Sequence, residues 1–125
     1  MKVRTVRDGL GQVCGLAFDC PGCGTRHAVN TVGPQAWSFN GDFERPTLSP
    51  SVLVRRGHYA NPDGQPGNCA CDFQQRFPNE APWPWPCTRC HSFVREGRIQ
   101  FLEDCTHALK GQTVDLPDCS EKTQP

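Results

Sequence analysis

The chain has 125 residues, an apolar fraction of 36% and no net charge, because 13 acidic residues offset its 13 basic ones. A chain of this length is most simply one domain. The even charge, with a single adjacent basic pair at Arg55-Arg56, argues against a nucleic-acid binding surface, and no stretch reaches the roughly 18 apolar residues that a membrane span requires.

The composition favours short strands and loops around a modest core, since the chain contains 12 Gly and 12 Pro. Its nine cysteines are an odd number, and the opening stretch MKVRTVRDGLGQV lacks the apolar core of a signal peptide. Both features favour the reducing cytoplasm, where closely spaced cysteines hold zinc more often than they form disulfides. We therefore expect a cytoplasmic domain that is stabilised by zinc.

Two β-prone stretches, 13–19 and 25–32, flank the first cysteine pair, and residues 2–7 are a weaker candidate for an edge strand. The pair reads Cys20-Pro-Gly-Cys23-Gly, and its Pro and Gly residues permit a tight turn that directs two thiolates at one metal ion. This pattern is typical of a zinc knuckle. The alternative is a free or redox-active pair, but such a pair usually opens a helix, and here a β-prone run follows.

The segment 33–50 is rich in turn-forming residues and carries three aromatic side chains, Trp37, Phe39 and Phe43. In a polar loop such residues most often form local core, and the functional alternative is a wall beside a substrate. Residues 47–55 then predict a strand that begins irregularly, because prolines interrupt its start.

Residues 56–86 interrupt the succession of strands. They are rich in Asn, Pro, Gly and Gln, show no periodicity, and form an insertion that is too long to be ordered without a specific reason. Four cysteines supply one, because Cys69-x-Cys71 and Cys87-x-x-Cys90 would close a second tetrahedral zinc site that holds both ends of the insertion. The alternative is that Cys90 belongs to the first site.

The clearest local signal is a β-hairpin over 92–102, where two β-prone runs meet at a Glu-Gly pair that ends at Gly97. After the hairpin, Asp104 can cap a short helix over 105–110. Gly111 would end this helix by taking a left-handed conformation.

The hairpin also brings the residues at its two open ends close together. Cys105 and His107 follow it, and they are our choice for the two remaining ligands of the first zinc site, because a structural site is normally closed at four ligands. His27 and Cys90 are the alternatives. His107 can also be an ordinary histidine at the start of a helix.

A serine nucleophile with a histidine base is a further hypothesis. Ser51, or Ser49 two residues earlier on the same side of the strand, can project from a rigid sheet, and His91 starts the hairpin. An imidazole within hydrogen-bond reach of the hydroxyl would take its proton during attack on a carbonyl. Serine and histidine occur together in most chains, so the residues alone leave open both this hypothesis and a purely structural role.

Longer motifs occur in order along the chain: Trp37-x-Phe39-Asn40-Gly41-Asp42, Arg45-Pro-Thr-Leu-Ser-Pro-Ser-Val52, Cys90-His-Ser-Phe-Val-x-x-Gly-x-Ile-Gln-Phe-Leu102, Asp104-Cys-Thr-His-Ala-Leu109 and Gly111-Gln-Thr-Val114. Together they resemble the bacterial and phage family catalogued as domain of unknown function 6527. The resemblance covers most of residues 13–117, and the insertion at 56–86 is the part without a match.

This family is in turn similar to small proteases that are encoded beside bacterial ubiquitin-like conjugation genes and that use a serine and histidine pair. Their Pro-Ser-Ile element corresponds to residues 50–52 here, and their Ser-His-aromatic element corresponds to the segment around 91–93. The resemblance implies that Ser51 is the nucleophile and His91 the base. The chain departs from those proteases in three residues of the phage-like branch, Cys90, Cys105 and His107.

The sequence therefore predicts a small β-rich domain of antiparallel strands and hairpins with one short helix, stabilised by zinc and ending in a flexible tail over 118–125. The predicted activity is that of a Ser-His dyad peptidase or amidase, acting on the tail of a ubiquitin-like protein or on another phage or host protein. Backbone amides near Ser51 would stabilise the oxyanion. No third catalytic member can be assigned among Asp42, Asp104 and Asp115.

The alternative function belongs to a different class, a noncatalytic zinc-binding phage accessory module that binds a protein partner. In such a module Ser51 would cap a turn, and His91 would be a core residue or a metal ligand. Substitution of Ser51 by Ala distinguishes the two functions, because only the peptidase needs the hydroxyl.

Overall fold

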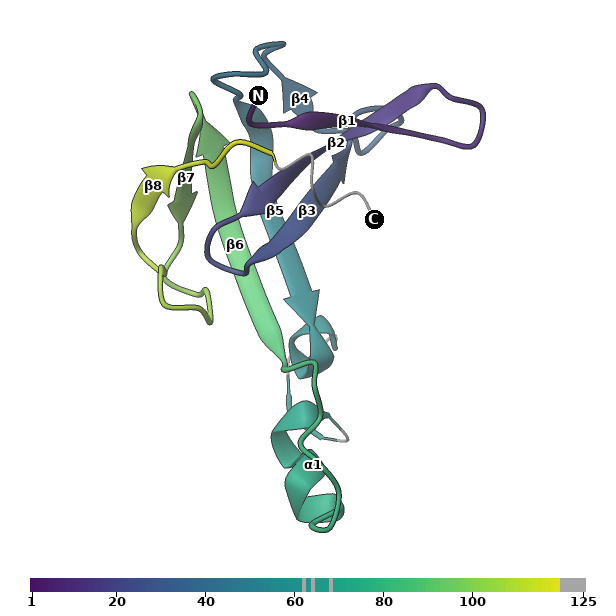
Figure 1. Ribbon diagram of the computed structural model, residues 1–125, viewed down its shortest axis with the longest axis vertical. Coiled ribbons are helices and arrows are strands. Elements are labelled where there is room, and N and C mark those ends of the chain that lie inside the picture. Colours follow the sequence, from purple (N-terminus) through teal and green to yellow (C-terminus); the bar gives the residue numbers. More distant parts are fainter. Residues whose placement is uncertain (62, 64, 68, 120–125) are drawn as a thin grey trace.

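The protein forms two antiparallel β-sheets, and the computed structural model describes residues 1–61, 63, 65–67 and 69–119. The first sheet joins, in order, β1 (Arg4–Arg7), β2 (Val13–Cys20) and β3 (Thr25–Asn30), and the second joins β4 (Ser38–Phe39), β5 (Leu48–Arg56), β6 (Thr88–Arg95), β7 (Arg98–Phe101) and β8 (Thr113–Asp115). Figure 1 shows β2 and β3 crossing in front of β5 and β6. The predicted class of fold, small, β-rich and antiparallel, is confirmed.

The core lies between the two sheets and follows from the alternation of side chains along the strands. In β6 every second residue from Cys90 to Val94 is buried. The largest buried side chains come from both sheets and include Phe18, Ile99 and Phe101. One face of β6 therefore packs in the core, and the other turns away from it.

The predicted hairpin is also confirmed. Arg95 of β6 pairs directly with Arg98 of β7, so the turn consists of Glu96 and Gly97. Their φ angles are 49° and 80°, and two consecutive positive φ angles define the tight turn whose twist matches that of the flanking strands.

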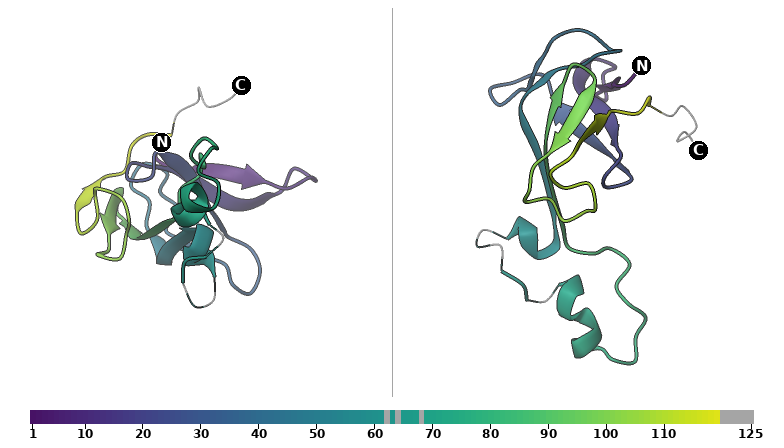
Figure 2. Two further views of the ribbon diagram at one scale, coloured as in Figure 1. Left: turned by 90° about the horizontal axis from the view of Figure 1, so that it is seen from below. Right: turned by 90° about the vertical axis from the view of Figure 1, so that its left-hand side faces the viewer.

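The insertion extends from the far end of β5 and β6 as a lobe, below the two sheets in Figure 1 and projecting from them in the right-hand view of Figure 2. It contains the short helix η1 (Gly57–Ala60) and α1 (Ala70–Arg76), the one α-helix among the described residues. The N-terminus of α1 is capped reciprocally, since the Cys69 side chain accepts from the first turn and the Cys69 N–H donates to Asp72 Oδ1 at 2.9 Å. We call residues 57–87, as far as they are described, the distal lobe.

The helix predicted over 105–110 is wrong, because this segment forms turns instead. Thr106 would lie in the first turn of that helix, where its N–H could be capped by the Asp104 side chain. Its N–H instead donates to the carbonyl of Arg89 in β6 at 2.9 Å. The Asp104 carboxylate, which was expected to cap the helix, faces His91 and Arg89. Within the described part of the chain, no helix has the length and apolar character needed to cross a membrane.

The end of the described chain packs against its beginning. Leu116 is fully buried, and the N–H of Cys119 donates to the carbonyl of Met1 at 2.9 Å. Asp118 lies 3.6 Å from the N-terminal amine. The first two residues of the predicted tail therefore make contacts, and residues 120–125 lie outside the described residues.

Candidate functional site

A bulge in β5 determines where the Ser51 side chain points. The pairing with β6 moves four residues along β5, from Leu48 to Val52, but only two along β6, from Val94 to Ser92. Such a bulge bends a strand and redirects its side chains. Val52 is 3% exposed and faces the core, so Ser51 lies on the opposite side of the sheet, which we call the outer face.

β6 turns His91 to the same outer face. Its neighbours Cys90 and Ser92 are buried, whereas the His91 side chain is 26% exposed. The His91 backbone is held from the β7 side, because the Leu102 N–H donates to its carbonyl at 2.9 Å and Cys105 Sγ lies 3.2 Å from both its N and its O. On the outer face, His91 Nε2 lies 2.9 Å from Ser51 Oγ.

Asp104 lies on the other side of the imidazole. Its Oδ2 is 3.3 Å from His91 Nδ1, the ring nitrogen that does not contact Ser51. Arg89 holds this segment in place, since its Nε donates to the Asp104 carbonyl at 2.8 Å and lies 3.8 Å from Oδ2. The three side chains therefore have the linear order of a Ser-His-Asp triad.

The two other carboxylates that the sequence offered are engaged elsewhere. Asp42 accepts hydrogen bonds from the backbone N–H groups of Arg45 and Glu44, both at 2.9 Å, and these bonds lower the pKa of its carboxyl. Asp115 pairs with Arg98 at 3.3 Å on the hairpin edge. One signal in the sequence favoured Asp104, namely that it follows the strand predicted to pair with the strand of His91.

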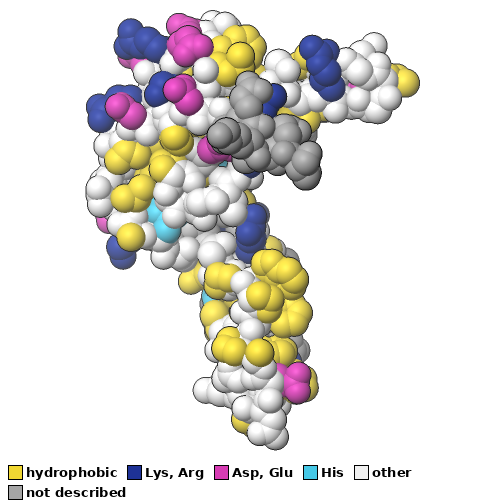
Figure 3. Space-filling view, in the orientation of Figure 1, with side chains coloured by type: hydrophobic (Ala, Val, Ile, Leu, Met, Phe, Trp, Pro, Cys, Tyr) yellow, Lys and Arg dark blue, Asp and Glu magenta, His cyan; other side chains and the backbone are white. Residues whose placement is uncertain are grey.

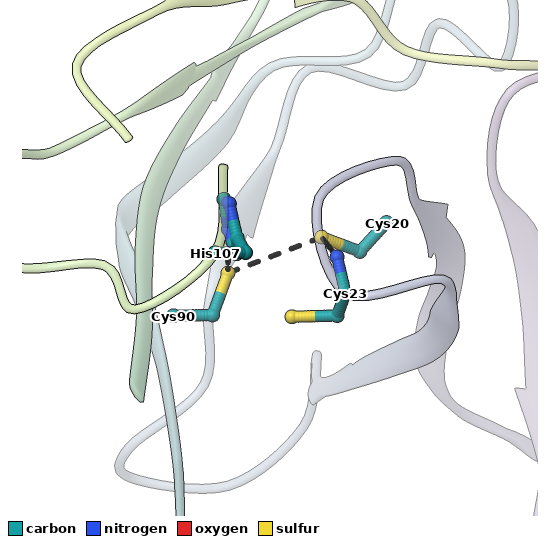
Figure 4. Close-up of side chains that lie close together, drawn as sticks. All are labelled: Cys20, Cys23, Cys90 and His107. Atoms are coloured by element: carbon teal, nitrogen blue, oxygen red, sulfur yellow. Dashed lines mark hydrogen bonds between the residues drawn. The ribbon is translucent and has the colours of Figure 1, made fainter. Parts of the chain in front are cut away.

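The first group of metal-ligand side chains lies on the core side of β6 and consists of Cys20, Cys23, Cys90 and His107 (Figure 4). All four ligand atoms lie within 4.8 Å of one another. Cys20 Sγ is 3.9 Å from Cys90 Sγ, which in turn is 3.5 Å from His107 Nε2. We call this group the first centre.

The first centre differs from the predicted group in one member, because Cys90 takes the position that the sequence analysis gave to Cys105. Cys90 lies on the core-facing side of β6, directly across from the cysteine pair of the β2–β3 turn. Cys105 is 4% exposed, and its Sγ lies against the His91 backbone instead. His27, the other alternative, is buried and lies outside the group of four. It borders a cavity of about 340 Å³ that is also lined by Cys90 and His107.

The thiols of the first centre are too close together to ionise independently. A hydrogen bond from Cys90 lowers the pKa of Cys20 to about 4, and the same contact, together with burial, raises the pKa of Cys90. Burial and the neighbouring Cys20 raise the pKa of Cys23 to about 11. A bound cation offsets such repulsion, so three thiolates and one imidazole fit a metal ion that prefers sulfur and nitrogen ligands.

A second group of four, His58, Cys69, Cys71 and Cys87, lies in the distal lobe, again with all ligand atoms within 4.8 Å of one another. His58 Nδ1 is 3.6 Å from both Cys69 Sγ and Cys71 Sγ, and the His58 N–H donates to Cys87 Sγ at 3.5 Å. Burial acts to raise the pKa of Cys87, but hydrogen bonds from His58 and Cys69 outweigh it and lower this pKa to about 6. We call this group the second centre.

The second centre contains His58 where the sequence analysis placed Cys90. This histidine was not predicted from the sequence, although it lies two residues after the end of β5, where the insertion begins. Gly57 makes the approach possible, because it has a φ of 67° and a Cβ there would lie 2.2 Å from Cys87 Sγ. Each centre therefore has three cysteines and one histidine.

A family model described as bacterial ubiquitination-like system serine protease (BubE) matches residues 2–102. The chain belongs to the BubE family. No curated protein and no solved structure gives a significant match.

The BubE match confirms the predicted relationship to proteases of bacterial ubiquitin-like systems. The name domain of unknown function 6527 stays a prediction. The matched range contains Ser51, His91 and the whole second centre, and it ends just before Asp104 and His107.

Gly22 is expected to be required at the first centre of this BubE chain. A Cβ at this position would lie 2.3 to 2.6 Å from three atoms of the His107 ring. The Gly22→Ala variant should therefore displace His107, weaken metal binding and lower the free energy of unfolding by about 1–3 kcal/mol. Thermal unfolding and competition with a chelator measure both effects.

The matched control is Gly9→Ala, since a Cβ at Gly9 would meet no atom within 4 Å. If Gly22→Ala bound metal as tightly as this control, the placement of His107 against Gly22 would be wrong.

Proposed function

We propose that this BubE chain is a serine peptidase in which Ser51 attacks an amide bond and His91 transfers the protons. The observation that carries the proposal is the separation of 2.9 Å between Ser51 Oγ and His91 Nε2. This is the reach that a general base requires. The description of the family as a serine protease supports the same reaction.

The reaction begins when Ser51 Oγ forms a bond to the carbonyl carbon, the carbonyl electron pair moves to its oxygen, and His91 Nε2 accepts the hydroxyl proton. The oxyanion collapses, the C–N bond breaks, and the imidazolium returns the proton to the departing amine. Water then repeats the sequence, releases the acyl group and restores the serine. Backbone N–H groups near Ser51 stabilise the oxyanion.

Asp104 extends the predicted dyad to a triad. A carboxylate beside Nδ1 keeps the ring proton on that nitrogen, so that Nε2 presents its lone pair to the Ser51 hydroxyl. It also stabilises the imidazolium that forms during attack. The contact of 3.3 Å between Asp104 Oδ2 and His91 Nδ1 supports this role.

The substrate in this proposal is a protein, in keeping with a protease family. The scissile bond lies in the C-terminal tail of a ubiquitin-like protein or in an exposed segment of another phage or host protein. The proposed compartment is the cytoplasm of a bacterium or of a phage-infected cell, where closely spaced cysteines stay reduced and can bind metal.

Zinc is the metal that the two centres are proposed to bind. Cys20, Cys23, Cys90 and His107 would hold one ion, and His58, Cys69, Cys71 and Cys87 the other. Each bound ion supplies free energy of folding. The catalytic steps belong to the outer-face residues alone.

The noncatalytic alternative is favoured by one observation, the aromatic surface of the distal lobe. Trp83 and Trp85 are 47% and 65% exposed, and Figure 3 shows hydrophobic side chains gathered on this lobe. A partner protein would bury such a surface. The contact between Ser51 and His91 makes the peptidase the leading proposal, because a binding module has no need of it.

Labelling with a fluorophosphonate probe tests the proposed function without knowledge of the substrate. The probe phosphonylates a serine whose hydroxyl is activated by a base. We expect one phosphonyl group per chain, located on Ser51 by tandem mass spectrometry. The Asp104→Asn variant should react about 10³- to 10⁴-fold more slowly, because it loses the carboxylate that orients the imidazole.

The heat-unfolded chain is the control, since the same serines are present there without the imidazole in place. A folded protein that is labelled no faster than the unfolded chain, or is labelled at another serine, would contradict the peptidase proposal.

A further inference from the structure

Over most of its length, β5 has a neighbouring strand on one side only. β4 pairs with β5 at Leu48 and Ser49 alone, whereas β6 pairs with it over residues 52–56. Figure 1 shows β5 continuing well past β4 toward the distal lobe. The strands that the structure describes therefore leave one edge of β5 unpaired from Ser51 onward.

The hydrogen bonds of β6 show which backbone groups of β5 point to that edge. In an antiparallel sheet, the N–H and C=O of alternate residues point to opposite neighbours. The carbonyls of Arg89 and His91 accept bonds from the β7 side, from Thr106 and Leu102. Cys90, between them, therefore bonds to β5.

The residue paired with Cys90 is Val54, and Val52 pairs with Ser92. These two valines consequently direct their backbone groups to β6. Leu53 and Arg55 alternate with them, so their N–H and C=O groups point to the open edge. β4 pairs with neither of them, and the backbone hydrogen bonds that the described residues form outside the strand ladders include none to Leu53 or Arg55.

Trp37 marks the end of the open edge. Its indole N–H lies 3.0 Å from the Pro50 carbonyl and 3.3 Å from the Ser51 carbonyl. The bond to Ser51 agrees with the alternation, since Ser51 is two residues before Leu53 and its carbonyl points the same way. The open edge therefore runs from the nucleophile, beside Trp37, to Arg55.

The side chains along this edge are available to a ligand. Leu53 is 43% exposed and stands directly across from His91 on the outer face. Arg55 is exposed and forms no ion pair with another described residue. An apolar side chain would pack on Leu53, and a carboxylate would pair with Arg55.

We propose that the substrate binds as an added β-strand along the Leu53–Arg55 edge, with its scissile carbonyl at Ser51. Unpaired N–H and C=O groups of an edge strand recruit an extended peptide through backbone hydrogen bonds. The ligand is an unfolded segment or tail of a protein, with an apolar residue over Leu53 and an acidic one near Arg55. This inference rests on the proposed function, because it takes Ser51 as the point of attack.

Amide hydrogen exchange measured by NMR tests the edge in the Ser51→Ala variant, which cannot cleave a ligand. In the free variant, the amides of Val52 and Val54 should be protected, while those of Leu53 and Arg55 exchange quickly. A mixture of ten-residue peptides of randomised sequence is the probe. We expect the peptides to slow exchange at Leu53 and Arg55 at least about tenfold.

A matched pair of variants tests the edge in catalysis. Leu53→Pro removes both the side chain and the edge N–H, whereas Leu53→Ala removes the side chain alone, and proline is tolerated where an edge N–H faces outward. For each variant, the rate at which the same peptide mixture is cleaved is divided by the rate of fluorophosphonate labelling. This ratio separates peptide binding from the reactivity of Ser51. We expect this ratio to be about tenfold lower for Leu53→Pro than for Leu53→Ala, the effect of one lost hydrogen bond.

Equal ratios for the two variants, or peptides that leave exchange at Leu53 and Arg55 unchanged, would overturn the edge proposal. Failure of the proposed function has a different signature. In that case the parent protein is not labelled at Ser51, whereas exchange in the Ser51→Ala variant still reports whether peptides bind the edge.

Discussion

Ser51→Ala is expected to abolish peptide hydrolysis while leaving the protein folded. Without the hydroxyl there is no nucleophile and no acyl intermediate, and loss of a catalytic serine typically lowers kcat by about 10⁴- to 10⁶-fold. The cost in stability is small, because one partly exposed hydrogen bond to His91 contributes about 0.5–1.5 kcal/mol. Peptide cleavage and thermal unfolding measure the two effects.

Ser49→Ala is the matched control for this variant. Ser49 is an exposed serine of the same strand and also lies within the bulge that ends at Val52. Among the described residues, the hydroxyl that contacts His91 is that of Ser51 and not that of Ser49. It should retain the activity of the parent protein. Full activity in Ser51→Ala, or an equal loss in both variants, would remove Ser51 from the mechanism and favour the binding module.

The parts of the fold that depend on local sequence were predictable. The hairpin at Glu96-Gly97 requires only two β-prone runs and a residue pair that accepts positive φ angles. The strands on either side of the Cys20–Cys23 turn are similarly local, with a regular register from Gly15 to Cys20. In such segments the pattern and the structure agree because no distant contact competes.

The helix was misplaced for a physical reason. Asp104 before the segment 105–110 has the features of a capped helix, but the sheet supplies stronger partners, and Thr106 bonds to Arg89 instead. The helix that does form, Ala70–Arg76, is capped by a cysteine, which is not among the usual capping residues. Sequence pattern alone could not identify it.

The cysteines that belong to each metal centre could not be assigned from spacing alone. The assignment depends on which face of a strand each side chain occupies, and the strand register determines that face. Cys90 is three residues from Cys87, a spacing that suggested one shared site. In the structure Cys90 lies within β6 and faces the core, while Cys87 precedes the strand and belongs to the distal lobe. His58 then completes the second centre, because the ends of the insertion meet there.

The candidate active site and the first centre lie on opposite faces of the same two segments. Cys90 faces the first centre, and the next residue, His91, faces Ser51. The turn after β7 repeats this arrangement, since Asp104 contacts His91 and His107 belongs to the first centre. An ion bound at the first centre would therefore hold both segments that position the His91–Asp104 pair.

Removal of metal from the first centre is accordingly expected to have the largest effect on stability. A structural zinc site contributes an apparent 10–16 kcal/mol in small domains, roughly as much as or more than the 5–15 kcal/mol by which a typical domain is stable. If the first centre binds zinc as proposed, Cys90→Ser should lose one metal ion per chain and unfold at room temperature, with loss of fluorophosphonate labelling. Elemental analysis and circular dichroism measure these outcomes.

Two further cysteine variants make this prediction specific. Cys14→Ser removes a partly buried thiol of β2 that belongs to neither centre, so it should bind as many metal ions as the parent protein and remain folded. Cys71→Ser, at the exposed face of the second centre, should lose one ion and melt the distal lobe, while the two sheets retain their core between Phe18, Ile99 and Phe101. If Cys90→Ser instead unfolded at the same temperature as Cys14→Ser, the first centre would contribute nothing to stability, and the connection between it and the His91–Asp104 pair would fail with it.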